Sequence, residues 1–323
     1  MSFNYINRKL DDFNEFLYGR KVAIIGLDKE SLSIIDYLHR HNAKISIFDT
    51  RTLDTLNLNI IDRIIHYNIQ YSFGEASLIK LKNVDMIIKS PEYRYDIKEI
   101  YEEESRGAIV TSVQELLIDL FPGKIIGITG NSDNEVFNFI SSIAYASGYE
   151  CIFDNDINKP LLTRLYDIDE NSILLMEFNE KQLLGLNNSP DISIITNMTQ
   201  NYNPSFMTYD EYEECIKNMF RFQKSDGITV LNADDELVCN LKSQVLSNTI
   251  LYSESKKLDN GIIYDENMIK LCKDGVRRHM MKLNSNEKKQ IKNICASFAT
   301  TLSFCDLDTQ VKAISQKIME HIY

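Results

Sequence analysis

A strand–turn–helix–strand pattern near the start of the chain restricts the fold more than any other feature of the sequence. Residues 21–26 (Lys-Val-Ala-Ile-Ile-Gly) form a run rich in β-branched side chains that stops at a glycine. Apolar residues follow at helical spacing between 32 and 38, and a second strand-like run at 44–48 ends at Asp49. This order is typical of the first βαβ unit of a nucleotide-binding, doubly wound sheet.

The rest of the sequence predicts a second domain of the same class. A length of 323 residues is about twice that of a usual ~150-residue domain. Further apolar runs that suit parallel strands covered on both faces lie at 84–88, 108–110, 125–128, 172–176, 192–195 and 228–231. Helical patterns lie at 113–120, about 134–147, 290–304 and 309–322. With 121–124 (Phe-Pro-Gly-Lys) as a linker, we predict an α/β chain of two doubly wound domains, a Rossmann-like domain over 1–120 and a second domain over 121–323.

Composition and charge exclude several classes of protein. Hydrophobic residues make up 44% of the chain and charged residues 25%, which is typical of a globular protein rather than a disordered one. The net charge of −12 opposes binding to nucleic acid or to an anionic membrane, because phosphates meet repulsion over most of the surface. No apolar run approaches the ~18 residues of a membrane span, and the N-terminus lacks the apolar stretch of a signal peptide. We therefore predict a cytoplasmic protein without membrane insertion and without a nucleic-acid partner.

Short phrases spread over nearly the whole chain carry a family resemblance. In chain order they are 22–27 (Val-Ala-Ile-Ile-Gly-Leu), 48–51 (Phe-Asp-Thr-Arg), 87–91 (Ile-Ile-Lys-Ser-Pro), 125–130 (Ile-Ile-Gly-Ile-Thr-Gly) and 230–235 (Val-Leu-Asn-Ala-Asp-Asp). Each phrase alone is a common α/β string. Their order and spacing together resemble the Mur ligases of peptidoglycan synthesis, in particular the members that add D-glutamate.

The resemblance implies a division of labour between domains. In this family the N-terminal domain binds a uridine nucleotide, the central P-loop-type domain binds ATP, and a third domain binds the amino acid. The sequence ends about where the central domain ends in the family, so we expect the C-terminal ligase domain to be absent. Positions that match nucleotide-binding residues of the family, and that we expect to be vestigial, are Gly26, Asp49, Thr50, Ser90, Gly127, Thr129, Gly130, Asn134 and Asn293.

The phosphate-binding loop of the family, G-x-x-G-T-N-G-K-T/S, is altered in this chain. Residues 127–135 read Gly-Ile-Thr-Gly-Asn-Ser-Asp-Asn-Glu, so Asp133 replaces a glycine, Asn134 the lysine and Glu135 the hydroxyl residue. A P-loop surrounds phosphate with backbone N–H groups, neutralises it with the lysine and holds Mg²⁺ through the hydroxyl. A like-charge contact at ~4 Å costs ~1 kcal/mol in water and ~4 kcal/mol at intermediate screening. We therefore expect a degenerate P-loop with little affinity for ATP.

The turn on the uridine side changes in the same direction. The family pattern G-L-G-x-S/T-G-L-S matches residues 26–33, where two glycines are lost and Asp28 and Glu30 are present. The family's Ser-Pro-Gly becomes Ser-Pro-Glu, ending at Glu92. Anionic side chains therefore gather at the expected diphosphate site. Asp49 and Thr50 nevertheless leave open a sensor that still holds a uridine nucleotide.

The resemblance also implies a metal ligand and a catalytic lysine. Glu177 matches a metal-binding glutamate, but Asn201 and Tyr202 stand where the family has an Asp-His pair, so a structural role at a strand end is the alternative. The lysine that the family carbamylates to hold its second metal aligns with Ile216. A register change of one residue gives this role to Lys217, which otherwise lies ~100° away on a helix. We assign no other catalytic residue and expect no bound cofactor.

We therefore interpret the chain as a truncated, degenerate homologue of the D-glutamate-adding ligases. In this interpretation it is catalytically inactive and has a binding or regulatory role in peptidoglycan precursor synthesis, with a UDP-linked precursor or a cell-wall synthesis protein as partner. The alternative is an active ATP-dependent D-glutamate ligase, with ATP and Mg²⁺ in an atypical site or with its third domain on another chain. Whether the protein is an enzyme is left open between these two interpretations.

Overall fold

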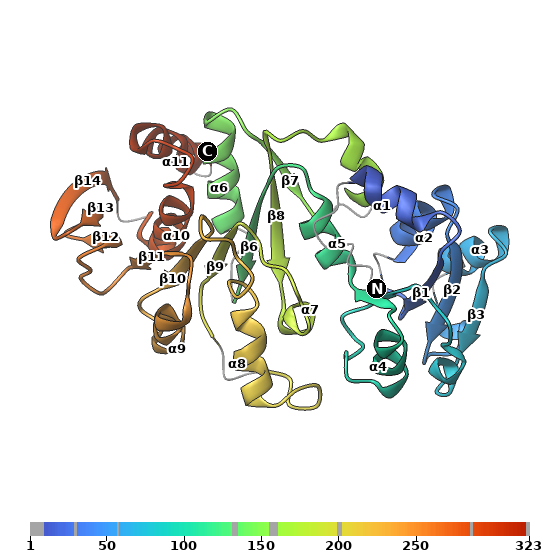
Figure 1. Cartoon of the computed structure of the whole chain (residues 1–323). Helices are drawn as coiled ribbons and strands as arrows, with labels where there is room; N and C mark the ends of the chain where they lie inside the picture. The colour runs from blue at the N-terminus through green and yellow to red at the C-terminus, as the bar shows by residue number, and fades with distance from the viewer. Residues whose placement is uncertain are drawn as a thin grey trace. The chain divides into compact units, whose positions relative to one another are not determined.

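The structure is a computed structural model that describes residues 10–28, 31–56, 58–130, 135–154, 161–198, 202–284 and 287–320, apart from the side chains of 31–33 and 320. The chain forms two compact α/β units (Figure 1). Unit 1 is Met1–Pro122, Asp154–Ile168 and Leu184–Asn187, and unit 2 is Gly123–Phe153, Asp169–Leu183 and Asn188–Tyr323. Two later segments thus group with the first unit, and the sequence boundary between 120 and 121 stays a prediction.

Unit 1 is built on a five-stranded parallel sheet with the order β3-β2-β1-β4-β5. Its strands are β1 (Lys21–Ile25), β2 (Lys44–Asp49), β3 (Gln70–Phe73), β4 (Met86–Lys89) and β5 (Ile109–Thr111). Its helices are α1 (Leu10–Leu17), α2 (Ser31–Arg40), α3 (Leu58–His66), α4 (Lys98–Ser105) and α5 (Val113–Leu120), with 3₁₀ segments η1 (Leu53–Thr55), η2 (Ser77–Lys80) and η3 (Leu161–Asp167). The predicted βαβ unit is thus present as β1, α2 and β2.

The core of unit 1 follows from the apolar runs of its strands. Four of the five residues of β1 are buried, as expected for a central parallel strand covered on both faces. One buried cluster joins residues of β1, β2 and β4 to η2 and α4: Ala23, Ile25, Phe48, Leu78, Leu81, Ile87 and Ile100. Helix α5 begins at Ser112, whose side chain accepts a hydrogen bond from the Glu115 amide at 3.2 Å. These elements fix the loops at the carboxyl ends of β1 and β4.

Unit 2 contains a nine-stranded sheet with the order β14-β13-β12-β11-β10-β9-β6-β8-β7. Its strands are β6 (Lys124–Thr129), β7 (Glu150–Phe153), β8 (Ser172–Phe178), β9 (Ile192–Ile195), β10 (Ile228–Asn232), β11 (Asn248–Ser253), β12 (Gly261–Asp265), β13 (Met268–Lys273) and β14 (Val276–Lys282). Pairing is parallel from β7 to β12 and antiparallel from β12 to β14. The predicted strands at 125–128, 172–176, 192–195 and 228–231 correspond to β6, β8, β9 and β10.

The antiparallel end of this sheet is not among the strands that we predict from the sequence. Two-residue turns join its strands: Glu266 and Asn267, with φ of 53° and 62°, between β12 and β13, and Asp274 and Gly275, with φ of 49° and 78°, between β13 and β14. Positive φ at both central residues matches the twist of paired strands, and Asp-Gly is a typical sequence for it. The Asp-Gly pair was therefore the sequence signal of this hairpin, because its strands do not form the apolar runs by which the other strands were predicted.

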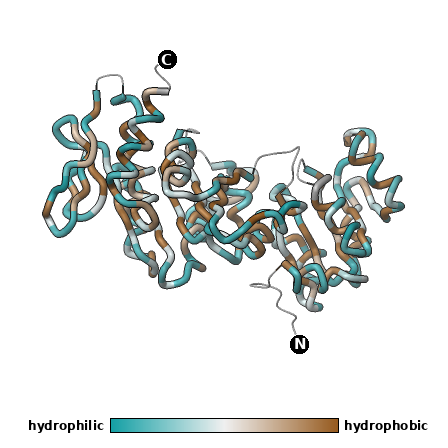
Figure 2. Tube along the Cα trace, turned by 90° about the horizontal axis from the view of Figure 1, so that it is seen from above, coloured by the Kyte–Doolittle hydropathy of each residue, from teal (hydrophilic) through white to brown (hydrophobic). Residues whose placement is uncertain are grey.

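Helices α6 (Glu135–Ala146), α10 (Ile291–Thr301) and α11 (Leu307–Glu320) lie close together in unit 2 and agree with the three helical patterns predicted there (Figure 1). Their buried residues, among them Phe139, Ile294 and Ile314, share one core with the strands. The shorter α-helices are α7 (Glu180–Leu183), α8 (Tyr209–Lys217) and α9 (Glu236–Asn240), and the 3₁₀ segments are η4 (Leu241–Gln244) and η5 (Glu287–Gln290). Hydrophobic residues recur along the chain trace in both units (Figure 2). In the described part of the chain, no helix combines the length and the apolar character that crossing a membrane requires.

Candidate functional site

The carboxyl edge of the unit 1 sheet brings together four of the residues that the family resemblance singled out. The chain leaves β1 toward β2 and β3 on one side and later adds β4 and β5 on the other, so the direction of winding reverses between β1 and β4. Ligands of open α/β sheets bind at the carboxyl ends of the strands at such a point. Gly26 follows β1 there, Asp49 and Thr50 lie at the end of β2, and Ser90 follows β4.

Asp49 holds this edge together through hydrogen bonds within the chain. The side chain is fully buried and accepts from the Leu27 amide (2.8 Å), the Arg51 amide (2.8 Å) and the Arg51 guanidinium (2.7 and 3.0 Å). Burial opposes ionisation of Asp49, but the hydrogen bonds from Arg51 and Leu27 outweigh it, so the pKa of this carboxyl is lowered. Arg51 also donates to the Leu27 carbonyl. The carboxylate therefore ties the turn after β1 to the end of β2.

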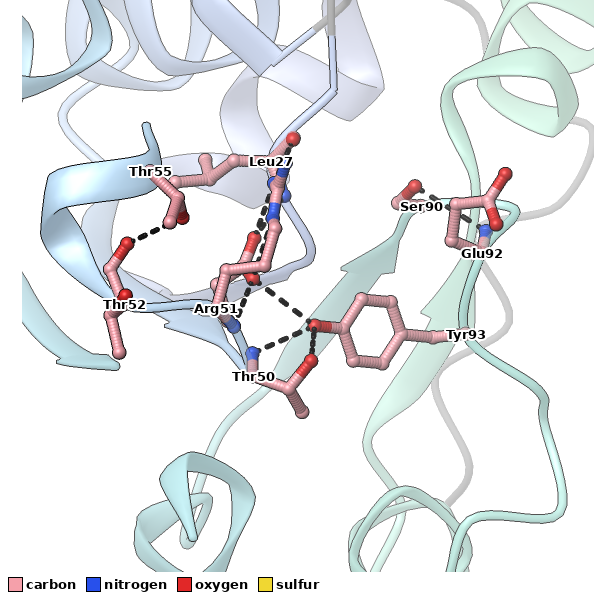
Figure 3. Close-up of polar contacts among 9 residues, drawn as sticks. Leu27, Thr50, Arg51, Thr52, Thr55, Ser90, Glu92 and Tyr93 are labelled. Carbon is pink, nitrogen blue, oxygen red and sulfur yellow. Dashed lines mark hydrogen bonds and ion pairs between the residues drawn. The ribbon is translucent and has the colours of Figure 1, made fainter. Parts of the chain in front are cut away.

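Tyr93, in the loop after β4, completes the cluster and was missed by sequence reasoning. Its hydroxyl accepts a hydrogen bond from the Thr50 amide at 2.9 Å and lies 2.9 Å from Thr50 Oγ1 and 3.4 Å from Asp49 Oδ1 (Figure 3). Its ring packs on Gly26, where a Cβ atom would lie only 2.5 Å from Tyr93 Cε2. Gly26 also has a φ of +79°. An aromatic residue three positions after Ser90 was the only signal in the sequence.

Ser90 and its neighbours form the other side of this edge. Ser90 is buried, its amide donates to the Ile25 carbonyl at 2.7 Å, and its hydroxyl oxygen accepts from the Glu92 amide at 3.4 Å. A small recess beside Gly26 and Ser90 is also lined by Asp28, Lys89 and Gln114 among other residues. Of the three acidic side chains expected near a diphosphate, Asp28 lines the recess, Glu92 is exposed, and Glu30 lies outside the described residues.

Lys89 and Glu115 are two buried ionisable residues behind this edge, and sequence reasoning also missed them. Lys89 is 3% exposed, and its ammonium lies 4.1 Å from the centre of the Tyr95 ring. Burial lowers the pKa of Lys89 to about 8, against the opposing effect of Glu115. Burial raises the pKa of Glu115 to about 7, although its carboxylate accepts from the Asn187 amide at 3.0 Å and from Thr111 Oγ1 at 3.2 Å. Both groups therefore titrate near neutral pH.

In unit 2, Gly127, Thr129 and Gly130 lie on β6 and just after it, and their contacts are internal. A Cβ atom on Gly127 would lie 2.5 Å from Pro190 Cγ, so this glycine admits a neighbouring side chain. Thr129 donates from Oγ1 to the Phe178 carbonyl at 2.8 Å. Gly130 has a φ of +107° and packs against Thr196 and Asn197. Residues 131–134, which include Asn134 and most of the altered loop, lie outside the described residues.

The predicted metal and lysine positions have different surroundings. Glu177, on β8 opposite Ile128 of β6, is exposed. Tyr202 packs with Tyr209 and Tyr212, with ring centroids 5.7 and 5.8 Å away, and Asn201 lies outside the described residues. Among the described residues no group of three or more His, Cys, Asp and Glu side chains is placed to hold a metal ion.

Lys217 lies on α8, one residue after the buried Ile216. Its ammonium pairs with Glu214 at 2.6 Å and Glu213 at 3.1 Å, and the hydrogen bond to Glu214 leads the effects that raise the pKa of Lys217. The amine is thus kept protonated, whereas carbamylation requires a free amine. Asn293 lies in the first turn of α10, half-buried, and its carbonyl accepts from Ser297 Oγ at 2.8 Å.

Two sequence families match the chain over regions that agree with the fold. The Mur ligase middle domain matches residues 109–301, and the MurD-like N-terminal domain of Mur ligases matches residues 20–112. The chain belongs to the Mur ligase family. The edge of unit 1 that holds Gly26, Asp49, Ser90 and Tyr93 falls within the MurD-like match, and Gly127 falls within the middle-domain match.

Two relatives of this Mur ligase family member share one name. The chain is 26% identical over 316 residues to the UDP-N-acetylmuramoylalanine--D-glutamate ligase of Clostridium acetobutylicum, covering 95% of this chain and 67% of that protein. It is 29% identical over 272 residues to the ligase of the same name from Acetivibrio thermocellus, covering 84% of this chain and 58% of that protein. The chain therefore spans about three-fifths to two-thirds of the length of these relatives.

A solved Mur ligase structure shares the fold. The UDP-N-acetylmuramate:L-alanyl-gamma-D-glutamyl-meso-diaminopimelate ligase from Neisseria meningitides superimposes with a TM-score of 0.51 at 11% identity, covering 91% of this chain and 97% of that chain. At this identity the likeness concerns the fold alone. It agrees with the predicted α/β architecture of parallel sheets.

Proposed function

We propose that this Mur ligase family member does not carry out ATP-dependent ligation and acts as a binding or regulatory protein in peptidoglycan precursor synthesis. Its partner is a UDP-linked precursor or a protein that makes or uses one. The edge of the unit 1 sheet is the site that would hold the uridine nucleotide. The altered loop after β6 is the reason why the ATP-dependent step is lost.

The observation that carries this proposal is the loss of positive charge where a triphosphate would bind. Residues 127–135 contain no Lys or Arg and contain Asp133 and Glu135. Over the wider segment 123–253, Lys and Arg number 8 whereas Asp and Glu number 19. A triphosphate needs cationic and N–H donors around it, and acidic side chains raise its free energy of binding instead. The lysine that could serve the second metal, Lys217, is already paired with two glutamates.

The residues present do not fit ATP and Mg²⁺ at this position. The hydroxyl that would hold Mg²⁺ is replaced by Glu135, and the described residues contain no cluster of metal-ligating side chains around Glu177. A carboxylate alone binds Mg²⁺, but the triphosphate that normally shares the ion would meet the same negative charge. We therefore derive no catalytic step through ATP in this chain.

The unit 1 edge supports the binding part of the proposal. The buried Asp49 carboxylate accepts one hydrogen bond from Leu27 in the turn after β1 and three from Arg51, which in turn donates to the Leu27 carbonyl, so the shape of the edge does not depend on a ligand. Ser90 lies on the facing loop, and the half-exposed Arg51 offers a guanidinium that contacts Leu27 in the turn after β1. A guanidinium and a hydroxyl beside a glycine turn are groups that bind phosphate oxygens.

Isothermal titration calorimetry with two ligands tests the proposal. We expect saturable heat with UDP-N-acetylmuramoylalanine and none with Mg·ATP up to millimolar concentration, and no phosphate release when D-glutamate is added. Saturable Mg·ATP binding would contradict the loss of ATP binding. Phosphate release that depends on D-glutamate would establish the active-ligase alternative, and absence of binding by the uridine compound would contradict the binding role.

A further inference from the structure

We propose that Tyr93 is an internal occupant of the ligand crevice in unit 1, so that a uridine nucleotide binds only when this side chain swings away. The inference rests on the proposed binding function and adds the residue that controls access. Tyr93 belongs to the loop after β4, which faces the turn after β1 across the point where the sheet reverses its direction of winding.

The Tyr93 ring lies where a ligand would enter the crevice. Gly26 and Ser90 are the residues that directly follow Ile25 and Lys89, and these two residues are paired in the register of β1 and β4. Ligands of doubly wound sheets enter between the loops that follow such a pair of strands. The ring lies in this place: a Cβ atom on Gly26 would be 2.5 Å from Tyr93 Cε2 and 2.8 Å from Ser90 Cβ. The ring therefore occupies the space beside Gly26 on the side where a Cβ would lie.

The Tyr93 hydroxyl contacts the polar groups of Thr50 that a ligand would use. It accepts a hydrogen bond from the Thr50 amide at 2.9 Å and shares one with Thr50 Oγ1 at 2.9 Å (Figure 3). It also lies 3.4 Å from Asp49 Oδ1. Thr50 is an exposed residue that directly follows β2, and a nucleoside in a doubly wound sheet finds its partners at the carboxyl ends of the strands. One side chain therefore combines a planar ring with a polar oxygen and satisfies groups that the ligand would need.

Side-chain rotation would move the Tyr93 ring out of the crevice, at the cost of its packing against the buried cluster that includes Ala23, Ile25 and Phe48. Tyr93 is only half-buried, and the preceding Glu92 is exposed. The Tyr93 amide donates to the Ser90 carbonyl at 3.1 Å, so a short turn fixes the backbone while the side chain is held only through its ring and hydroxyl. Rotation about the side-chain bonds opens the crevice at the cost of these contacts. The apparent affinity is then the intrinsic affinity multiplied by the fraction of molecules in which the crevice is open.

Calorimetry with UDP on three variants of the full chain tests this inference. If the crevice is open in about one molecule in ten, Tyr93→Ala binds UDP about tenfold more tightly than the wild type, because the competing side chain is gone. Tyr93→Phe keeps the ring and loses the hydroxyl contacts, so we expect a smaller tightening. The control is Tyr101→Ala, which removes an exposed tyrosine of α4 in the same unit and should leave the UDP affinity unchanged.

Each other outcome contradicts the inference in a recognisable way. Weaker binding by Tyr93→Ala would make the ring a contact surface for the base, and an affinity within twofold of the wild type would mean that Tyr93 does not compete. In both cases the wild type still binds UDP and the proposed function stands. If neither the wild type nor any variant binds UDP, the internal-occupant inference and the uridine part of the proposed function both fail.

An NMR measurement that does not rely on affinity distinguishes displacement of the Tyr93 side chain from unfolding of the variant. The Thr50 amide donates to the Tyr93 hydroxyl, so its NMR chemical shift reports whether that contact is made. Tyr93→Phe should shift this resonance, and UDP added to the wild type should shift it as well. A Thr50 resonance that UDP leaves unchanged, in a protein that binds UDP, would overturn the inference.

Discussion

The carboxyl edges of the two sheets accommodate acidic residues in different ways. In unit 1, Asp49 is buried and fully used: two backbone amides and the Arg51 side chain hold it. In unit 2, the acidic residues gather after β6 without a lysine or arginine in 127–135. The first edge therefore compensates its carboxylate within the chain, whereas residues 127–135 offer no Lys or Arg to a triphosphate.

Other acidic residues of unit 2 show that a carboxylate near a strand end can be purely structural. Asp234 follows β10 and accepts from Ser253 Oγ at 2.6 Å and from the Glu254 amide at 2.7 Å. Asp235 caps α9 and accepts from the Val238 amide at 3.0 Å. Both carboxylates satisfy backbone donors that would otherwise be unpaired. The comparison between the edges therefore depends on which partners each carboxylate has, and substitutions test it.

The largest effect should come from removing the buried carboxylate of unit 1. Asp49→Ala leaves the Leu27 amide and Arg51 without their acceptor, so we expect the free energy of unfolding to fall by about 3 kcal/mol in urea denaturation. The folded-state pKa of Asp49 lies below its unfolded value, so its stabilising contribution is present above the unfolded pKa and is lost as the pH falls through the folded pKa.

The difference between Asp49→Ala and the wild type should therefore shrink in acid. Asp96→Ala is the matched control, because Asp96 is an exposed carboxylate of the same unit that pairs with Arg94 at the surface, and it should change stability by less than about 0.5 kcal/mol. Equal effects of the two substitutions would mean that Asp49 does not hold the edge together.

A second experiment restores charge after β6. Combining Asp133→Gly, Asn134→Lys and Glu135→Ser recreates the family's loop chemistry, and we expect Mg·ATP affinity to rise by about thirtyfold, or about 2 kcal/mol, in calorimetry. Asn134→Gln alone serves as the control, because it changes the same position without adding charge. If the triple variant binds Mg·ATP no better than this control, loss of charge is not what disables the middle domain.

A third, smaller effect concerns the two buried ionisable residues behind the unit 1 edge. The pKa of Lys89 is lowered to about 8 in the folded protein, so its contribution to stability is intact only above its unfolded pKa and is lost as the pH falls through about 8. At pH 6, where Glu115 with its pKa of about 7 is mostly protonated, Lys89→Met should raise the free energy of unfolding by about 1 kcal/mol.

This gain should shrink gradually as the pH rises from about 8 toward the unfolded pKa of Lys89, about 10.4, because the amine is then increasingly neutral in both the folded and the unfolded state. Lys98→Met, at an exposed lysine of α4, should show no such pH dependence in the same thermal and urea measurements. A loss of stability at pH 6 in Lys89→Met would mean that the contact of the ammonium with the Tyr95 ring outweighs the cost of its burial.

Much of the fold could be predicted because parallel strands carry their signal locally. The apolar runs at 21–26 and 125–128 became β1 and β6, since central parallel strands are buried on both faces and need continuous apolar residues. The strands β11 to β14 were missed because their pattern is partly exposed; β14, for example, presents Val276 and Arg277 to solvent. Their best signal was the Asp-Gly turn, which is local but short.

The candidate site was predictable only in part. Gly26, Asp49, Thr50 and Ser90 were found through short phrases, and the sheet brings them to one edge. Tyr93, which touches Gly26 and Thr50, has no phrase that marks it, and Lys89 is hidden in an apolar strand. The altered loop at 131–134 was visible from the sequence, and its interpretation stays a prediction.

The sequence by itself indicated the central parallel strands and main helices, the family resemblance, and the loss of the lysine with the gain of two acidic residues after β6, because each is written in neighbouring residues. Only the tertiary structure decided that the Tyr93 ring lies on Gly26, that Asp49 is hydrogen-bonded to Leu27 and Arg51, and that Lys89 is buried beside Tyr95. These residues meet because the strand order 3-2-1-4-5 places loops from distant parts of unit 1 at one edge. Burial then fixes which of their charges remain compensated.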